Sequence, residues 1–215
     1  MGNAKWSKTV AQISNVTPPT PQLYERLWRV RSLSLLSGRP FPNVEELSEL
    51  LESLKPEPGR VFVDVACSEG LYARALAARG ATVFAVDHSK PFLRRVNERS
   101  GELRVVAVRA LAQSLPVCTA ALDGAAMGAS LNEIGDQAAA VSEMGRVVRP
   151  GGAAFSMSLT TATTPRGRFV QRLIGPLGIT TPTTETTLEF FELAGLRLQS
   201  HKLDRIVLRV SAIRP

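Results

Sequence analysis

Histidine and cysteine are almost missing from this chain of 215 residues, which has two of each. Two cysteines do not build a disulfide framework, and no group of cysteines and histidines has the spacing of metal ligands. No apolar run approaches the roughly 20 residues that cross a bilayer, and the N-terminal segment lacks the hydrophobic core of a secretory signal. We therefore expect a cytoplasmic protein without a metal site and without a transmembrane segment.

Acidic residues are also scarce, since 19 Asp and Glu face 26 Lys and Arg and leave a formal net charge of +7. A basic chain can bind nucleic acid, but the arginines are spread along the sequence without a basic tail or a lysine-rich run, so we expect no nucleic-acid partner. The densest groups lie in residues 94–109 and 166–172. Solvated helix faces explain both groups. The second group would also suit an anionic substrate or peripheral contact with a membrane surface.

What the chain does contain is an alternation of apolar segments with a small-residue turn. Residues 61–65 predict a buried strand, residues 66–70 predict a tight turn before a helix, and residues 81–87 predict a second buried strand that ends in an acid. This order is typical of the first half of a nucleotide-binding α/β unit, in which the acid accepts from ribose hydroxyls. Asp87 lies 21 residues beyond Ala66, which suits a cofactor that contains a ribose.

The small residues of the turn indicate the class of cofactor. In the dinucleotide pattern Gly-x-Gly-x-x-Gly the third glycine would fall at Leu71, which is not small. The small residues fall instead at Ala66, Ser68 and Gly70, with Asp64 two positions ahead of them. This spacing resembles the Asp-x-Gly-x-Gly-x-Gly pattern of class I S-adenosylmethionine (SAM)-dependent methyltransferases, with two of the three glycines replaced.

Three downstream segments strengthen this resemblance. Residues 109–116 resemble the Asp-Ala-x-x-Leu-Pro segment that lies along the adenine in that family. Residues 122–134 resemble the fourth strand and the turn beside the methyl donor. Residues 143–152, with the sequence Glu-Met-Gly-Arg-Val-Val-Arg-Pro-Gly-Gly, resemble the Arg-Val-Leu-Lys-Pro-Gly-Gly signature before the fifth strand. The resemblance extends over about residues 20–215 and is greatest to small enzymes of the quinone-biosynthesis type.

The resemblance and the alternation of strands with helices predict an α/β fold: a single-domain, Rossmann-like sheet of seven mostly parallel strands, with a C-terminal antiparallel hairpin and helices on both faces. The expected parts are a flexible segment over residues 1–20, a helical cap over 21–58 and a methyltransferase core over 59–215. The expected strands are residues 61–65, 82–86, 104–108, 122–127, 152–159, 196–200 and 206–212. The expected helices are residues 21–36, 43–54, 70–79, 90–98, 136–148, 166–174 and 184–195.

The resemblance also implies which residues bind SAM. Asp64 would order the turn and the methionine end of the cofactor, although an acid there also fits as a helix cap. Asp87 would accept both ribose hydroxyls. The remaining residues implied in cofactor binding are Ala66, Cys67, Ser68, Gly70, His88, Leu111, Ala112 and Met127.

Three of these residues depart from the family pattern. Ala66 and Ser68 replace glycines, which is acceptable only if φ is negative at both positions. Leu111 stands where an Asp commonly accepts a hydrogen bond from the adenine amino group. Losing that bond costs about 1 kcal/mol, or up to roughly 3 kcal/mol if a buried partner stays unpaired.

Asn132 and Glu133 are the candidates for catalysis, because they follow the fourth strand where related enzymes often carry His. Glu133 would act as a base for an acceptor that must lose a proton, with Asn132 as its orienting partner. Each residue would also fit as a polar residue at a helix start. The N-terminal helices cover the active site in related enzymes, which makes Tyr24, Trp28 and Phe41 candidates for substrate contact as well as for core packing.

The implied function is methyl transfer from SAM to a carbon or oxygen atom of a small-molecule acceptor of lipophilic character. The alternative is a methyltransferase-fold protein that no longer catalyses and serves as a binding or regulatory partner, since Ala66, Ser68 and Leu111 all depart from the pattern. The presence of both Asp64 and Asp87 favours the enzyme. An RNA-binding methyltransferase is a third hypothesis that rests on the net charge alone.

Overall fold

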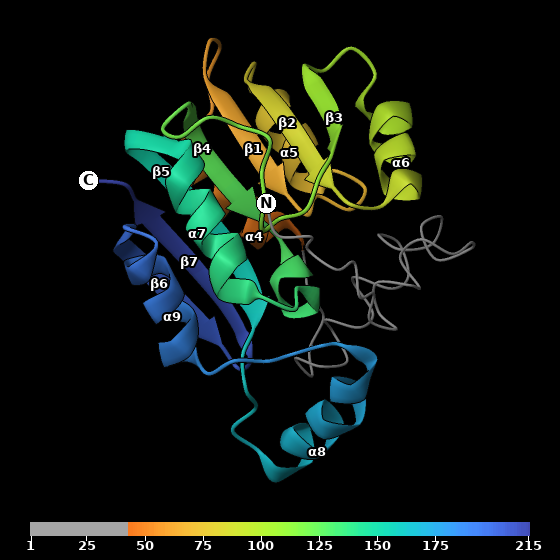
Figure 1. Ribbon diagram of the computed structural model, residues 1–215, viewed down its shortest axis with the longest axis vertical. Coiled ribbons are helices and arrows are strands. Elements are labelled where there is room, and N and C mark those ends of the chain that lie inside the picture. The colour runs from red at the N-terminus through yellow and green to blue at the C-terminus, as the bar shows by residue number, and fades with distance from the viewer. Residues whose placement is uncertain (1–42) are drawn as a thin grey trace, which may run out of the picture.

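The computed structural model describes residues 43–215 of the chain (Figure 1). It begins with α4 (Asn43–Leu54), the second helix expected in the N-terminal cap. The expectations that lie outside the described residues are the flexible segment 1–20, the helix 21–36 and the substrate-contact candidates Tyr24, Trp28 and Phe41.

One sheet of seven strands runs through the molecule in the order β3-β2-β1-β4-β5-β7-β6. β7 is antiparallel to both of its neighbours, and the pairs among β1 to β5 are parallel. The expected mostly parallel sheet with antiparallel C-terminal strands is therefore confirmed. The strands are β1 (Val61–Val65), β2 (Thr82–Asp87), β3 (Val105–Arg109), β4 (Leu122–Met127), β5 (Val148–Leu159), β6 (Arg197–Asp204) and β7 (Val207–Ile213).

Helices cover both faces of this sheet. Figure 1 shows α7 and α9 in front of the sheet and α4 and α5 behind it, and each group packs its apolar residues into a separate core. No helix in residues 43–215 combines the length and the apolar character needed to cross a membrane. Besides α4, the helices are α5 (Leu71–Ala77), α6 (Lys90–Ser100), α7 (Gln137–Val147), α8 (Pro165–Ile174) and α9 (Thr184–Leu193), with short 3-10 helices η2 (Ala129–Glu133) and η3 (Gly175–Leu177).

α4 shows why these helices bind the sheet. Its leucines at positions 47, 50, 51 and 54 recur at the spacing that puts them on one helical face. Leu50 and Leu54 are fully buried and join the core that contains Phe62 of β1 and Phe155 of β5. Burying a leucine side chain contributes about 1.5–3 kcal/mol. The face of α4 that carries the leucines therefore fixes this helix against the middle of the sheet.

Two strands extend four residues beyond their expected boundaries, β6 at its end and β5 at its start, where it meets α7. The helix expected to end at residue 148 is followed directly by β5, because Val148 already pairs with Leu122 of β4. Pairing resumes at Ala153, which lies opposite Gly124, so residues 149–152, of which 149–151 are exposed, form a bulge. Pro150 lies in this bulge and has no N–H to donate to a ladder, which explains the interruption.

α7 and α9 approach each other very closely at Gly145. A Cβ atom placed on Gly145 would lie 2.2 Å from the carbonyl oxygen of Ala194, just after α9. That oxygen is backbone and cannot move aside without shifting the end of α9. Gly145 is therefore required by helix packing rather than by backbone conformation.

We expect Gly145→Ala to lower the free energy of unfolding by about 2–3 kcal/mol, since overpacking against backbone cannot relax through a side-chain rotation. Gly175→Ala is the matched control, because Gly175 has right-handed helical dihedral angles and its Cβ would meet no atom within 4 Å. Urea unfolding followed by circular dichroism measures both effects. Equal stability of the two variants would contradict the packing argument.

Candidate functional site

The carboxyl ends of neighbouring strands form the edge at which the expected site residues gather. β1, β2 and β4 are adjacent and parallel, so Val65, Asp87 and Met127 end on the same edge. The hydroxyl of Ser130 in η2 donates to the carbonyl oxygen of Ala66 at 2.8 Å. The loops that follow β1 and β4 are therefore in direct contact.

The turn after β1 has the backbone path of a glycine-rich turn. Ala66, Ser68 and Gly70 have φ angles of 53°, 50° and 76°. The negative φ expected at Ala66 and Ser68 is therefore wrong. A left-handed conformation brings Cβ close to the following carbonyl oxygen, which costs roughly 1–2 kcal/mol per residue. Contacts from elsewhere must hold this turn in place.

Asp87 supplies one of those contacts. Its carboxylate is 4% exposed, and its two oxygens accept from the N–H of Ser68 at 3.0 Å and the N–H of Ser89 at 2.8 Å. Burial raises the pKa of Asp87 above its ordinary value of 3.8, while His88 and these N–H groups act in the opposite direction. Asp87 thus connects the turn after β1 to the end of β2 and the start of α6.

Asp64 occupies the end of β1 and reaches the first turn of α5. It is buried, and one carboxylate oxygen accepts from the N–H of Ala73 at 2.9 Å. The residue before α5 is Gly70, which offers no side-chain cap. Asp64 therefore caps this helix across the turn, one of the two roles considered for it. Its contact with the methionine end of SAM stays a prediction.

His88 and Cys67 lie beside Asp87. The Nδ1 atom of His88 is 3.4 Å from a carboxylate oxygen of Asp87, and its buried Nε2 atom has no hydrogen-bond partner among the described residues. Burial, together with the charges of Asp64 and Asp87, raises the pKa of the Cys67 thiol well above 9.0. The thiol is therefore protonated and unreactive. The backbone of Cys67 donates to the carbonyl of Val86 at 2.9 Å and supports the turn.

The segment after β3 is held by two side chains of α7 that the sequence analysis did not single out. Glu143 accepts from the N–H of Leu115 at 2.7 Å, and Arg146 donates to the carbonyls of Leu115 and Val117 at 3.1 and 2.8 Å. The hydrogen bond from Arg146 is the main reason that the pKa of Glu143 lies below its usual value. Their separation of three residues within the signature 143–152 was the available sequence signal.

Leu111 and Ala112, expected along the adenine, lie between β3 and the residues that Glu143 and Arg146 hold. We call these two side chains the α7 clamp. The segment starts beside the site, because Ala110 donates its N–H to the backbone carbonyl of Asp87 at 3.2 Å. Ala112 is buried and Leu111 is half-buried. The α7 clamp on one side and the bond from Ala110 to Asp87 on the other therefore hold both residues close to Asp87.

Asn132, expected as an orienting partner in catalysis, is engaged with the backbone. Its side chain is 2% exposed and donates to the carbonyls of Leu159 and Thr180, both at 2.7 Å. It also accepts from the N–H of Leu159 at 2.7 Å. Asn132 thus joins the loop after β4 to the two ends of the segment that carries α8. Glu133 follows it and is half-buried, and its role as a base stays a prediction.

A buried pair on α4 and α5 lies next to the same loop and was missed from the sequence. The hydroxyl of Tyr72 donates to the carboxylate of Glu46, and both side chains are buried. A Cβ atom on Gly128, at the start of η2, would lie 3.7 Å from the Tyr72 ring. Met127 itself is fully buried in the core on the α7 side. Tyr72 therefore lines the β4 end of the site more directly than the side chain of Met127.

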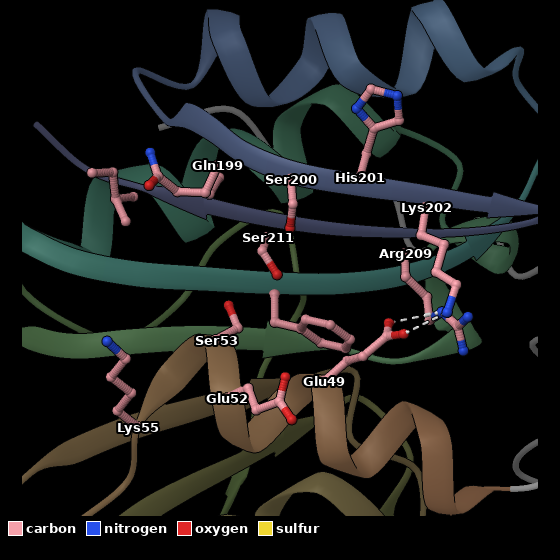
Figure 2. Close-up of a pocket in the computed structure, with 13 residues that line it drawn as sticks. Glu49, Glu52, Ser53, Lys55, Gln199, Ser200, His201, Lys202, Arg209 and Ser211 are labelled. Atoms are coloured by element: carbon pink, nitrogen blue, oxygen red, sulfur yellow. Dashed lines mark hydrogen bonds and ion pairs between the residues drawn. The ribbon is translucent and has the colours of Figure 1, made fainter.

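A cavity of about 630 Å³ lies away from this edge, between α4 and the β6–β7 hairpin. Figure 2 shows Lys202 and Arg209 pointing toward Glu49, while His201 points away from them. The buried guanidinium of Arg209 lies 2.9 Å from a carboxylate oxygen of Glu49. None of the residues expected in the cofactor site lines this cavity. Glu49, Lys202 and Arg209 therefore join α4 to the β6–β7 hairpin and do not contribute to the candidate cofactor site.

Comparison with known proteins shows which family part of the chain is similar to. Residues 63–156 match the family described as a methyltransferase domain. The chain is 33% identical over 145 residues to an uncharacterized chloroplastic methyltransferase of Arabidopsis thaliana, which covers 63% of this chain and 40% of the relative. It is 31% identical over 142 residues to a ubiquinone biosynthesis O-methyltransferase of Paracidovorax citrulli, with 62% and 57% covered. The chain thus spans about half the length of these curated relatives.

A solved structure extends the likeness to the fold. The crystal structure of the cyclase SpnF matches 97% of both chains with a TM-score of 0.72 and 16% sequence identity. At this identity the match shows a shared fold and says nothing about a shared reaction.

We expect Ala66→Gly and Ser68→Gly each to raise the free energy of unfolding by up to about 1 kcal/mol. Glycine removes the left-handed penalty at these positions but adds entropy to the unfolded chain, so the net gain is smaller than the penalty. The control is Ala138→Gly at an exposed position of α7, where a loss of about 0.5–1 kcal/mol is expected. Thermal unfolding measures all three, and losses at positions 66 and 68 would contradict the assigned backbone strain.

Proposed function

We propose that this protein, whose residues 63–156 match the methyltransferase-domain family, transfers the methyl group of SAM to a carbon or oxygen atom of a small lipophilic acceptor. The observation that carries this proposal is the position of Asp87. A buried carboxylate ends β2 at the sheet edge and also holds the turn after β1 through Ser68. This is the place where a ribose-containing cofactor meets this type of sheet.

The residues around Asp87 fit SAM. The Oδ2 atom of Asp87 accepts the N–H of Ser68 and has a second lone pair that could accept a ribose hydroxyl. The buried Nε2 atom of His88 would gain a hydrogen-bond partner from the adenosine. The turn containing Ala66 and Ser68 presents its backbone, and Leu111 offers an apolar wall for the adenine but no acceptor for its amino group.

SAM, when bound, supplies a methyl group already activated by its sulfonium charge. The task left to the protein is to align the acceptor and to exclude water. Met127 and Leu131 are fully buried in the core behind the loop after β4 and support that loop. Glu133 would take the proton of a phenolic acceptor, or of an activated ring carbon, as the new bond forms.

The lipophilic character of the acceptor rests on the names of relatives and on the lining of the site. One relative is a ubiquinone biosynthesis O-methyltransferase. Ala129, Leu131 and Ile134 are the apolar side chains at the β4 end of the site, and the polar side chains of Ser130 and Asn132 there are bonded to backbone carbonyls. Transfer to oxygen requires removal of one proton, and transfer to carbon requires an activated ring, so Glu133 would serve in both reactions.

The second candidate is a protein of this fold that binds a partner or ligand without transferring methyl groups. Ala66, Ser68 and Leu111 depart from the family pattern along the cofactor path, and the fold is shared with SpnF, which is a cyclase. Asp64 and Asp87 favour the enzyme, because both carboxylates are buried at the cofactor edge. The cytoplasmic location and the lack of a nucleic-acid partner remain predictions, and one relative is chloroplastic.

We expect the protein to bind SAM and S-adenosylhomocysteine in titration calorimetry, and Asp87→Asn to weaken binding about 10- to 100-fold, because a hydrogen bond to a charged group contributes about 1.5–3 kcal/mol. Asp123→Asn is the matched control. Asp123 accepts from the N–H of Val61 at 2.7 Å at the opposite, amino edge of the sheet. Equal weakening in both variants would point to a general loss of structure. Failure of the wild type to bind either ligand would reject the enzyme.

As the pH is lowered, SAM affinity should begin to fall at a higher pH than it would if Asp87 had the pKa of an ordinary aspartate. Burial raises the pKa of Asp87 above 3.8, so protonation begins earlier as the pH falls. A protonated carboxyl accepts ribose hydroxyls poorly, and the dissociation constant should rise about tenfold per pH unit below that pKa. Calorimetry across the acid range tests this, and Asp87→Asn should remove the pH dependence.

Glu133→Gln should lower the rate of methyl transfer about 10²–10⁴-fold while leaving SAM affinity unchanged, since a general base contributes to the rate by that factor. The measurement is release of S-adenosylhomocysteine with a panel of substituted catechols and naphthoquinols. Restored activity at high pH, where a phenol ionises without help, would distinguish a lost base from a lost fold. An unchanged rate would remove Glu133 from the mechanism.

A further inference from the structure

α8 is bonded to the rest of the molecule through its first residues and Gln171, and it stands outside the sheet and the helices that cover it (Figure 1). Gln171 on its inner face accepts from the N–H of Ala162 at 2.8 Å and donates to the carbonyl of Thr160 at 2.9 Å. Thr161 donates its N–H to the carbonyl of Pro182 at 2.9 Å, which closes the base of the excursion. These hydrogen bonds therefore fix the orientation of α8 and decide which of its faces points outward.

That outer face carries a stripe of large apolar side chains. Phe169 and Leu173 are 60% and 62% exposed, and Leu177 of η3 is 43% exposed. Phe169 and Leu173 lie four residues apart in α8, the spacing that aligns side chains along one side of a helix, and Leu177 follows in η3. An exposed stripe of this kind is unusual in a protein that functions only in bulk water.

Arginines flank this stripe on both sides. At helical spacing Arg166 falls on one side of the Phe169–Leu173 line, and Arg168 and Arg172 fall on the other. All three are exposed, and Arg168 also donates to the carbonyl of Thr163 at 2.7 Å. Residues 160–184 contain these three arginines and no Asp or Glu.

The arginines of residues 94–109 differ from those of α8, because two of them form ion pairs with acidic residues of the same region. Arg99 pairs with the buried Glu69, and Arg95 lies 2.9 Å from Glu98. Charge there is neutralised within α6 and the cofactor turn. α8 has no acidic residue of its own to neutralise its arginines.

We propose that the outer face of α8 and η3 docks onto the surface of an anionic lipid bilayer. Phe169, Leu173 and Leu177 would enter the acyl boundary, and the flanking arginines would extend to lipid phosphates. A helix of 10 residues is too short to span a bilayer and lies flat in the interface. The net charge of +7 adds attraction to an anionic surface.

A bilayer suits this face better than RNA or an acidic protein. RNA would be met by arginines and by aromatic side chains that stack on bases, and an aliphatic stripe has no task there. An acidic protein would need its own apolar ridge between two rows of carboxylates. A bilayer offers apolar depth and surface phosphate together, in the same arrangement as the side chains of this helix.

Docking at α8 would place the candidate site at the membrane surface, a consequence that rests on the proposed function. Asn132, in the loop after β4, bonds both Leu159 and Thr180, the residues that lead into and out of the excursion. The segment that carries α8 therefore leaves and rejoins the rest of the molecule beside the loop after β4. A lipophilic acceptor dissolved in the bilayer would then reach the methyl donor without crossing water.

The test is flotation of the full chain with vesicles of phosphatidylcholine alone and of equal parts phosphatidylcholine and phosphatidylglycerol. We expect binding to the anionic vesicles that weakens with salt. The double variant Phe169→Ser/Leu173→Ser should reduce the bound fraction about tenfold, and Arg166→Gln/Arg172→Gln should remove the preference for anionic lipid. The matched control is Val44→Ser/Leu193→Ser, which removes apolar side chains that are 77% and 78% exposed elsewhere. This control should bind as the wild type does.

Absence of vesicle binding, or equal loss in the Val44/Leu193 control, would overturn the proposal. So would a finding that the α8 variants lose binding to an RNA oligonucleotide and keep binding to vesicles. Thermal unfolding of each variant excludes a loss of fold as the cause. Vesicle binding is measured without SAM and should be normal in Asp87→Asn, so failure of the docking and failure of the proposed methyl transfer are separate results.

Discussion

The buried carboxylate of Asp87 is the interaction on which the rest of the candidate site depends. It accepts from Ser68 in the turn after β1 and from Ser89 at the start of α6, so one side chain positions a turn, a strand end and a helix. A buried charge without such partners would be strongly destabilising. Conversely, if Asp87 did not accept from Ser68, the strained left-handed conformation of Ala66 and Ser68 would relax. The same hydrogen bonds therefore stabilise the acid and maintain the strained turn.

The other loops at this edge are also fixed by side chains that come from distant elements. Arg146 of α7 holds the segment after β3, and Asn132 joins the loop after β4 to Leu159 and Thr180. Such supports pre-organise a binding site before any ligand arrives. The α8 excursion beyond these anchors leaves its apolar stripe and arginines in solvent. The edge that ends in Asp87 is thus held by several side chains, whereas the outer face of α8 is exposed.

Much of this arrangement could be predicted from local pattern. The apolar runs around Asp64 and Asp87 predicted two buried parallel strands, and both are observed with those acids at their ends. The φ angles of Ala66 and Ser68 could not be predicted correctly. Their sign depends on contacts from Asp87 and Ser130, which are distant in sequence, and local propensity alone would avoid a positive φ for these residues.

The sequence by itself determined the α/β sheet, its mostly parallel strands and the carboxylate that ends β2. The period of the apolar residues and the alternation of strands with helices can be read directly along the chain. Only the tertiary structure decided that Asn132 ties loops together, that Tyr72 bonds Glu46 and that Arg146 clamps the segment after β3. Each of these contacts joins residues far apart in sequence, and no local pattern specifies which partner a polar side chain will meet. That choice is made when the layers pack and every buried donor and acceptor needs a partner.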